Sequence, residues 1–165
     1  LNTDDGRRHV KDIFDTAGPQ LPITLHLGET SATDPKTFRK TIELIQPKRI
    51  SHPITPVLEY LNYGKSEGME VMRDYGVVVE FLPRSNEITR RVKSISDFKD
   101  IIAACREFDI PVTIGTDAPG FQGMSFAQEL ANLFLCEAAS LSDINSFIIT
   151  GLESCFANPN RTLAR

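Results

Sequence analysis

Four residues in this sequence have side chains that can bind a divalent metal ion or transfer protons: His26, Glu29, His52 and Asp117. Imidazole nitrogens and carboxylate oxygens are ligands for Zn²⁺ and similar ions. Such an ion lowers the pKa of a bound water, and a carboxylate that does not bind the metal can carry protons. These residue types therefore indicate metal-assisted hydrolysis.

Each of these residues also has an ordinary structural interpretation when it is taken alone. A histidine at a strand end is often a hydrogen-bonded core residue, and His52 before Pro53 is typical of a turn. Glu29 is compatible with a surface carboxylate, and Asp117 within GTDAPG is compatible with a turn or a helix cap. The functional interpretation depends on whether the fold brings the four together.

Four short apolar runs are predicted to be β-strands, and the polar residues lie where these runs end. The runs cover residues 21–27, 49–52, 77–82 and 111–115. The third, VVVEFL, is the most apolar and is typical of a strand buried on both faces. The polar segments at the strand ends are His26 to Glu29, His52, PRSN at 83–86, and Asp117.

Helical patterns, with apolar residues three and four positions apart, alternate with these strands. Residues that can cap a helix N-terminus precede four of them, namely Asp34, Ser96, Ser125 and Ser142. Strands that alternate with helices at this spacing predict a parallel α/β sheet with crossover helices. The loops at the carboxyl edge of such a sheet carry the active site, so the four polar residues are expected to converge there.

Composition indicates an ordinary globular chain of one domain, with 165 residues, 41% hydrophobic and 24% charged. The net charge of −4 argues against nucleic acid or an anionic membrane as the partner. No apolar run reaches the length of a membrane span, and no secretory leader is recognisable. Cys105, Cys136 and Cys155 are widely spaced, which favours a reducing, cytoplasmic setting over a disulfide scaffold.

Four motifs resemble those of the adenosine deaminase family. HLGE at 26–29, RISHP at 49–53, VEFLPRSN at 79–86 and TIGTDAPG at 113–120 correspond to HAGE, RIGHG, a strand ending in CPxSN, and a strand ending in TDDP. Order and spacing agree over residues 21–156. The resemblance implies a metal-dependent hydrolase on a TIM-type (β/α)8 barrel. Residues 1–165 would be a single partial domain, the C-terminal half with strands five to eight.

The resemblance also implies roles for individual residues. His26 and Asp117 would bind Zn²⁺, with two further histidine ligands from an HxH pair that this sequence lacks. Gly28 would offer its backbone to the purine ring, and Glu29 would protonate a ring nitrogen. His52 would orient the attacking hydroxide, and Asp117 would take a proton from water. The substrates would be water and adenosine or a related amino-purine nucleoside or nucleotide, with release of ammonia.

Three departures from the family pattern bear on these expectations. Ala118 replaces a second aspartate that contacts the purine, which makes an altered purine or a nucleotide a plausible substrate. Ser51 and Pro53 replace the glycines beside His52, so that histidine is expected to be posed differently. Half a barrel would expose two strand edges, so the fragment alone is expected to be inactive and to self-associate or pair with an N-terminal half.

Two other functions are compatible with the same sequence. One is a degenerate homologue that binds a nucleoside without catalysis, which Ala118 and the missing HxH pair favour. The other is a different amidohydrolase reaction, such as removal of a chloro or methoxy group from a heterocycle. Ala118 leaves that possibility open, because the purine contact is the part of the pattern that differs.

Overall fold

The computed structural model of the protein describes residues 3–17, 22–30 and 33–156. In these residues a parallel sheet has four strands in the order of the chain. They are β1 (Thr24–His26), β2 (Arg49–Ser51), β3 (Val78–Phe81) and β4 (Val112–Ile114). The Cα register aligns His26, Ser51, Glu80 and Thr113 across the sheet, so these residues lie on one face.

Helices connect the strands and follow the last one. In chain order they are α1 (Asp4–Ala17), α2 (Pro35–Ile45), α3 (Ile54–Tyr63), α4 (Glu67–Asp74), α5 (Pro83–Ile88), the 3₁₀ turn η1 (Ile95–Asp97), α6 (Phe98–Glu107), α7 (Pro119–Gln122), α8 (Phe126–Leu135) and α9 (Leu141–Glu153). No helix within the described ranges is both long and apolar enough to cross a membrane.

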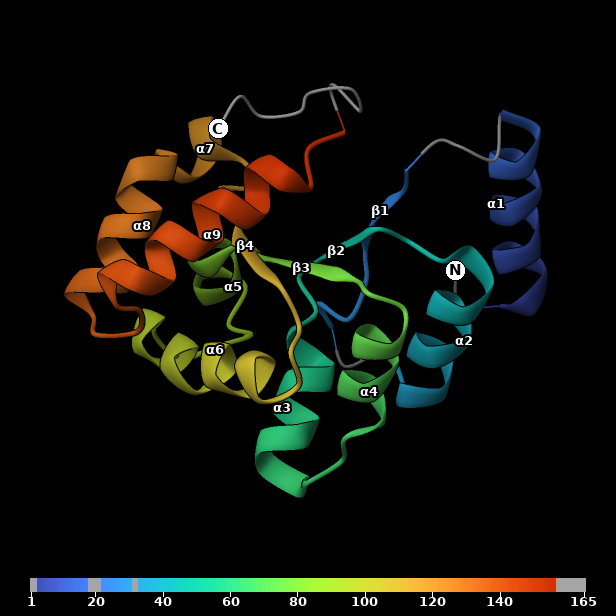
Figure 1. The fold of residues 1–165 in the computed structure, drawn as a ribbon, viewed down its shortest axis with the longest axis horizontal. Coiled ribbons are helices and arrows are strands. Elements are labelled where there is room, and N and C mark those ends of the chain that lie inside the picture. Colours follow the sequence, from blue (N-terminus) through green and yellow to red (C-terminus); the bar gives the residue numbers. More distant parts are fainter. Residues whose placement is uncertain (1–2, 18–21, 31–32, 157–165) are drawn as a thin grey trace.

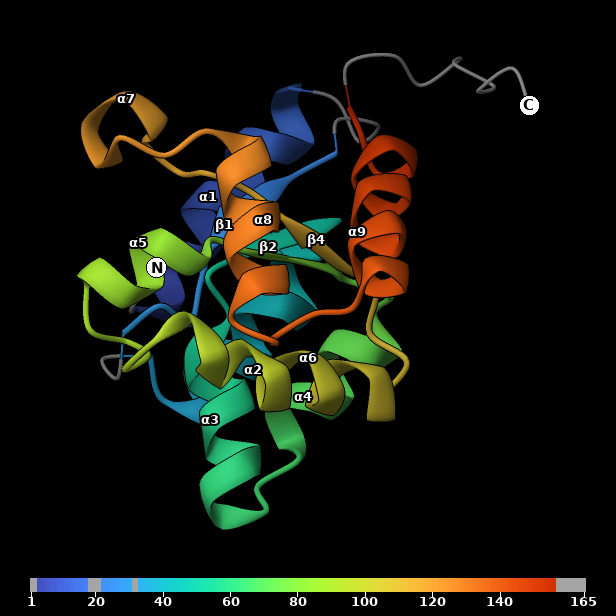
Figure 2. The same cartoon turned by 90° about the vertical axis from the view of Figure 1, so that its left-hand side faces the viewer.

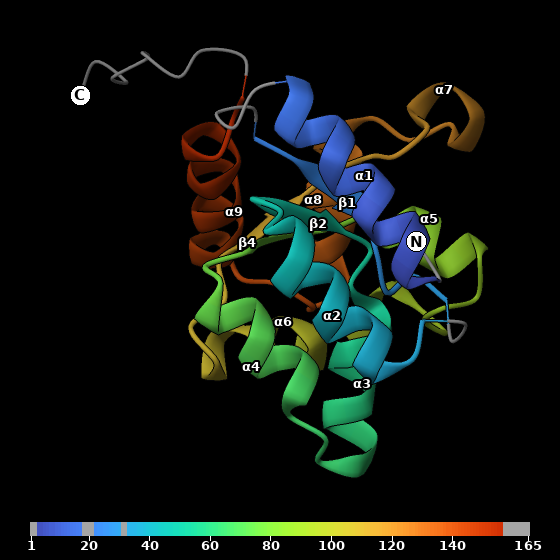
Figure 3. The same ribbon diagram turned by 90° about the vertical axis from the view of Figure 1, so that its right-hand side faces the viewer.

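The helices form an arc around the sheet. In Figure 1 the arc runs from α1, beyond β1, through α2, α4, α3 and α6 to α8 and α9 near β4. Packing between α1 and α2, α2 and α4, α3 and α4, and α3 and α6 holds one side of the arc together, and α9 packs on β4. Figures 2 and 3 show α2, α3, α4 and α6 below the strands, with α8 and α9 higher. This is the arrangement of a partial barrel.

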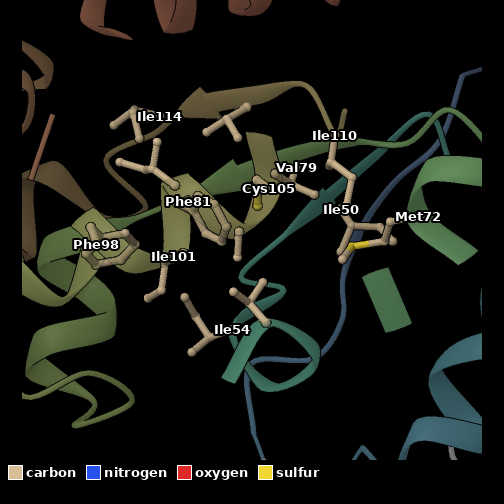
Figure 4. Close-up of a cluster of buried hydrophobic side chains, with 14 of the residues drawn as sticks. Ile50, Ile54, Met72, Val79, Phe81, Phe98, Ile101, Cys105, Ile110 and Ile114 are labelled. Atoms are coloured by element: carbon tan, nitrogen blue, oxygen red, sulfur yellow. The ribbon is translucent and has the colours of Figure 1, made fainter. Parts of the chain in front are cut away.

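The core lies between one face of the sheet and the helices α3, α4 and α6. Figure 4 shows Val79 and Phe81 of β3 among side chains such as Ile50, Phe98 and Ile101. All five are fully buried. Burial of each side chain of this size contributes roughly 1.5–3 kcal/mol. The apolar face of the sheet therefore holds the strands in place and fixes the position of their carboxyl ends.

The prediction that residues 77–82 form a strand buried on both faces is wrong in one respect. Val79 and Phe81 are buried, whereas Val78 and Glu80, on the other face, are only half-buried. Glu80 has polar partners there: its carboxylate accepts a hydrogen bond from Ser51 at 2.6 Å and lies 3.6 Å from the Arg49 guanidinium. A charged residue tolerates this position because its oxygens are paired.

Two of the four predicted helix caps are confirmed and two are displaced. Asp34 accepts the Thr37 N–H, and Ser125 forms a capping box. Ser96 and Ser142 do not cap their helices. Ser94 caps η1, directly before α6, and Ser140 caps α9. Ser94 and Ser140 are the caps because each has an aspartate three residues later, namely Asp97 and Asp143, which completes a reciprocal capping box.

Glu129 of α8 is a buried carboxylic acid at the contact between α8 and α5. Its Oε2 accepts the backbone N–H of Arg84 at 3.3 Å, and its Oε1 has no partner in the part of the chain that the structure describes. Burial raises the pKa of Glu129 from its ordinary 4.5 to about 7, and the Arg84 N–H only partly opposes this shift. The buried position therefore favours the neutral acid form of Glu129.

We expect Glu129 to make the protein less stable as the pH rises. The raised pKa means that the folded state binds this proton more tightly than the unfolded state. The stabilisation is complete below about pH 4.5 and is lost as the pH rises through about 7. The total loss in the free energy of unfolding is on the order of 3 kcal/mol. Urea unfolding at pH 5 and pH 8 measures this loss. Glu129→Gln should remove most of this dependence of stability on pH. An unchanged dependence in the variant would contradict the assignment.

Candidate active site

The carboxyl ends of β1, β2 and β4 carry the residues singled out from the sequence. His26 is the last residue of β1, and Glu29 follows it by three positions. His52 comes directly after β2, and Asp117 comes three residues after β4. His26 and Asp117 are exposed, Glu29 is half-buried and His52 is buried. The sheet thus places all four at one edge, as the motif order predicted.

The two histidines lie against each other. The His26 and His52 ring centroids are 5.1 Å apart, with the ring planes at 76°, an edge-to-face contact. β1 and β2 pair directly, with His26 opposite Ser51, so adjacent strands bring the rings together. This contact links two of the predicted site residues directly.

Asn86 fixes the orientation and tautomer of His52. The Asn86 Nδ2 lies 3.0 Å from the His52 Nδ1, and both side chains are buried. An amide nitrogen can only donate, so Nδ1 accepts and the neutral ring carries its proton on Nε2. The His52 backbone N–H also donates to the Glu80 carbonyl at 3.0 Å. His52 is therefore held by two neighbouring segments with a defined N–H donor on the free side of its ring.

Burial and neighbouring charges act on the pKa of His52 in opposite directions. Burial lowers this pKa below its ordinary 6.5, and the nearby His26 acts in the same direction. The carboxylates of Glu29, Asp117 and Glu80 oppose the shift. Burial dominates, so the neutral imidazole is the favoured form near neutral pH.

Asp117 is oriented by two side chains that were not among the residues predicted for the site. Its Oδ2 accepts a short hydrogen bond from the Ser85 hydroxyl at 2.6 Å and a longer one from the Gln122 amide at 3.4 Å. Ser85 and Asn86 both belong to the PRSN segment, which was recognised as a strand-end signature without individual roles. Their position after a predicted strand was the available signal.

His52 and Asp117 share an unusual backbone conformation. Their φ angles are 58° and 56°, in the left-handed region that residues other than glycine rarely adopt. Such conformations cost about 1–3 kcal/mol each and occur preferentially where side chains must be aimed for function. Gln46, Arg90, Asp109 and Glu137 also have positive φ, each after a helix. His52 and Asp117 are the two that follow strands, and their side chains are also fixed by hydrogen bonds.

Gly28 occupies a position at which a side chain has no room. Its φ is 83°, and a Cβ there would lie 3.0 Å from the Phe38 ring and 3.1 Å from Pro56. Its carbonyl accepts the Thr55 N–H at 2.8 Å, so that oxygen already has a protein partner. The glycine allows the loop after β1 to pack on α2 and α3 while Glu29 remains at the sheet edge. A contact between its backbone and a purine stays a prediction.

We expect Gly28→Ala to destabilise the protein more than Gly76→Ala. Both glycines have positive φ, so either substitution should cost about 1–2 kcal/mol in backbone strain. Gly76 has no atom within 4 Å of an added Cβ, whereas at Gly28 crowding should add about 1–3 kcal/mol. The midpoints of urea denaturation measure this difference in stability, provided that the free energy of unfolding of both variants falls equally steeply with urea concentration. Equal losses would show that the loop relaxes around the new methyl group.

The donors for a metal ion have the right chemistry but are too few. His26 and Asp117 offer an imidazole and a carboxylate, which suit Zn²⁺. Among residues 3–17, 22–30 and 33–156, no group of three His, Cys, Asp or Glu side chains is arranged to hold an ion. Structural and catalytic zinc sites take at least three protein ligands. These residues can therefore form only part of such a site.

Comparison with known proteins identifies the family. The family model for adenosine deaminase matches residues 5–164, almost the whole chain. The chain belongs to the adenosine deaminase family. An adenine deaminase from Rhizobium meliloti is 28% identical over 147 residues, which are 89% of this chain and 42% of that protein. An adenosine deaminase from Clostridium perfringens is 24% identical over 136 residues, covering 82% of this chain and 38% of that protein.

A solved structure supports the fold of this family member. The apo N6-methyl-AMP deaminase from Arabidopsis thaliana is 24% identical and matches with a TM-score of 0.69, over 90% of this chain and 40% of that chain. The likeness confirms the prediction of an α/β fold that is part of a barrel. The chain spans about two fifths of the length of the relatives that it matches.

Proposed function

We propose that this chain is the part of a purine deaminase barrel that carries strands five to eight, and that the whole protein hydrolyses the exocyclic amine of an amino-purine. One observation carries the proposal: the His26 and His52 rings lie 5.1 Å apart at the sheet edge where Glu29 and Asp117 also lie. The family match over residues 5–164 supports it. Adenine, adenosine and N6-methyl-AMP, named for the relatives, share a 6-aminopurine.

The proposed mechanism divides the work among the four residues. Glu29 protonates a nitrogen of the purine ring, which makes the neighbouring carbon more electrophilic. His52 donates its Nε2–H to the attacking water, because Asn86 occupies the other ring nitrogen. Asp117, held by Ser85, accepts a proton from that water. The proton on Asp117 passes to the amine, which leaves as ammonia. The ring nitrogen keeps the proton from Glu29, and the proton of the new hydroxyl returns to Glu29 as the carbonyl forms.

The proposed cofactor is one Zn²⁺ ion, which would be held by His26 and Asp117 together with histidines from residues outside this sequence. When bound, such an ion lowers the pKa of water towards neutrality. The need for further ligands follows from the incomplete donor set in the described residues. The proposed setting is the cytoplasm, because Cys105, Cys136 and Cys155 are free thiols in the structure.

Metal analysis and an assay of the released amine on the full-length protein that contains this chain test the proposal. Adenine, adenosine, AMP and N6-methyl-AMP are the substrates to compare. We expect about one zinc per chain and hydrolysis of at least one of the four, with ammonia released from adenine, adenosine or AMP and methylamine from N6-methyl-AMP. A full-length preparation with neither metal nor turnover would refute the proposed function.

A second candidate function is purine binding without catalysis. Ala118 favours it, because the methyl group cannot make the contact expected of the aspartate that the resemblance places there. Calorimetry distinguishes the two functions. Binding of inosine or adenosine without any release of ammonia would support the binding function, and turnover that depends on Glu29 would exclude it.

A further inference from the structure

The short helix α5 holds two of the proposed site residues at once. Its Ser85 hydroxyl donates to the Asp117 carboxylate at 2.6 Å. The next residue, Asn86, holds the His52 ring through the 3.0 Å contact at Nδ1. Asp117 follows β4 and His52 follows β2, so this one helix connects two strand ends. A displacement of α5 would therefore misplace both side chains together.

α5 has little within itself that fixes its position. It has six residues, and a helix this short gains little from its own hydrogen bonds. Leu82, directly before it, has no side-chain oxygen that could accept the free N–H groups of the first turn. Pro83 carries no N–H, so Arg84 is the first residue of α5 whose N–H needs an acceptor. That acceptor has to come from another element.

Glu129 of α8 supplies this acceptor. Its Oε2 accepts the Arg84 N–H at 3.3 Å, which is the one hydrogen bond of the Glu129 side chain within the described residues. The Arg84 guanidinium bonds Glu87 at 2.6 Å instead. The hydrogen bond of Glu129 is therefore to the backbone of α5 and not to a charged side chain.

α8 is anchored independently of this contact. Ser125 and Gln128 form a capping box at its start, and Leu130 and Leu133 belong to the buried core. Glu129, directly before Leu130, has no exposed surface. Figure 2 shows α8 beside α5, and the two helices pack on each other. The Glu129 carboxyl group therefore links the first turn of α5 to a helix whose position is fixed by other contacts.

Stability alone does not explain a carboxyl group at this position. Transfer of such a group out of water is unfavourable, and the Glu129 Oε1 has no partner in the described part of the chain. An apolar side chain of similar volume would avoid this cost. What the acid adds, in contrast to an apolar residue, is an oxygen that reaches the Arg84 N–H.

We propose that Glu129 is a positioning residue of the active site. Its carboxyl oxygen caps α5 from α8. Through Ser85, α5 then holds Asp117. Through Asn86, it holds His52. The inference rests on the proposed function and adds to it a residue that acts without touching the substrate. The acceptor oxygen of Glu129, and not a negative charge, is the feature that matters.

Three variants of the full-length protein test the role of this oxygen. Glu129→Gln keeps an acceptor at the same reach, Glu129→Met removes it, and Glu129→Asp withdraws it by one methylene group. The assay uses whichever of adenine, adenosine, AMP and N6-methyl-AMP the wild type hydrolyses best. We expect Glu129→Gln to keep kcat within about 3-fold of the wild type, because an amide oxygen also accepts an N–H.

Glu129→Met should lower kcat by about 10- to 100-fold and change KM by less than about 3-fold, because misplacement of site residues by about 1 Å has effects of this size on the chemical step. Wild-type kcat in this variant would overturn the proposal, and so would an equal loss in Glu129→Gln. If Glu129→Met does not fold, Glu129→Asp takes its place in the same comparison.

Nitrogen NMR of His52 reports the position of α5 without any need for turnover. While Asn86 holds Nδ1, the proton is on Nε2, and both tautomers become populated when that contact is lost. We expect the Nε2–H tautomer in the wild type and in Glu129→Gln, and both tautomers in Glu129→Met. Urea unfolding of the same samples checks that they are folded. An unchanged tautomer in folded Glu129→Met would overturn the assignment.

The failure of this inference and the failure of the proposed function are distinguishable. If the wild type releases no amine, the proposed function fails, while the tautomer of His52 still decides the role of Glu129. Glu107→Met is the matched control, because Glu107 is exposed at the end of α6 and accepts the Tyr60 hydroxyl at 2.7 Å. This control should match the wild type in kcat and in tautomer, and losses equal to those of Glu129→Met would also overturn the assignment.

Discussion

Replacement of Glu29 by glutamine is expected to reduce turnover by about 10²–10⁴-fold while the metal content stays unchanged. The amide keeps the size of the side chain but cannot deliver a proton to the purine ring. Glu29 follows the proposed ligand His26 by three residues and is half-buried beside Gly28, so the substitution leaves the proposed metal ligands in place. Steady-state assays together with metal analysis of the same preparation measure both quantities.

Glu43→Gln is the matched control for Glu29→Gln. Glu43 is a residue of α2 whose carboxylate pairs with Arg39 at 3.4 Å, away from the strand ends. Exposed pairs of this kind contribute little, so its turnover should equal that of the wild type. Retention of turnover within a few-fold in Glu29→Gln would remove Glu29 from the mechanism. Loss of zinc from that variant would instead make Glu29 part of the metal site.

Replacement of Asn86 by aspartate is expected to reduce turnover by about 10²–10⁴-fold through His52. A carboxylate accepts hydrogen bonds and does not donate them, so it would draw the imidazole proton from Nε2 to Nδ1. The N–H of His52 would then point at the introduced carboxylate rather than at water, and the ring would lose its proposed role. The new negative charge should also raise the pKa of His52.

Nitrogen NMR of the imidazole distinguishes this tautomer effect from general damage to the fold. In the wild type we expect the proton on Nε2, and in Asn86→Asp we expect it on Nδ1. Asn132→Asp introduces the same charge on α8, where Asn132 is half-buried, and should change neither the tautomer nor the rate. An unchanged His52 tautomer in Asn86→Asp, with low turnover, would show that Asn86 acts structurally.

Local patterns accounted for much of the fold. Alternation and apolar runs located all four strands of the described sheet, although β1 is shorter than the predicted 21–27, of which residue 21 lies outside the described ranges. Asp34 and Ser125 were identified as caps because the partners of a helix cap lie within three residues. The predicted caps Ser96 and Ser142 are wrong because Ser94 and Ser140 each have an aspartate three residues later and form the capping boxes instead.

Part of the chemistry of the site could also be predicted from the sequence. Residue types and motif order identified His26, Glu29, His52 and Asp117 as the candidates, and the structure places them at one edge of the sheet. Their catalytic and metal-binding roles remain predictions. The short helices α5 and α7 were not predicted, although each begins with a proline at its first turn. The positions of Asn86 and Gln122 depend on those helices.

The sequence by itself determined the residue types, the strand ends and the family motifs, because these depend on order and spacing along the chain. The tertiary structure decided which groups meet: Asn86 with His52, 34 residues apart, and Ser85 with Asp117, 32 residues apart. Such contacts depend on the register of parallel strands and on helix packing, which bring distant segments together. The tautomer of His52 and the orientation of the Asp117 carboxylate follow from those contacts.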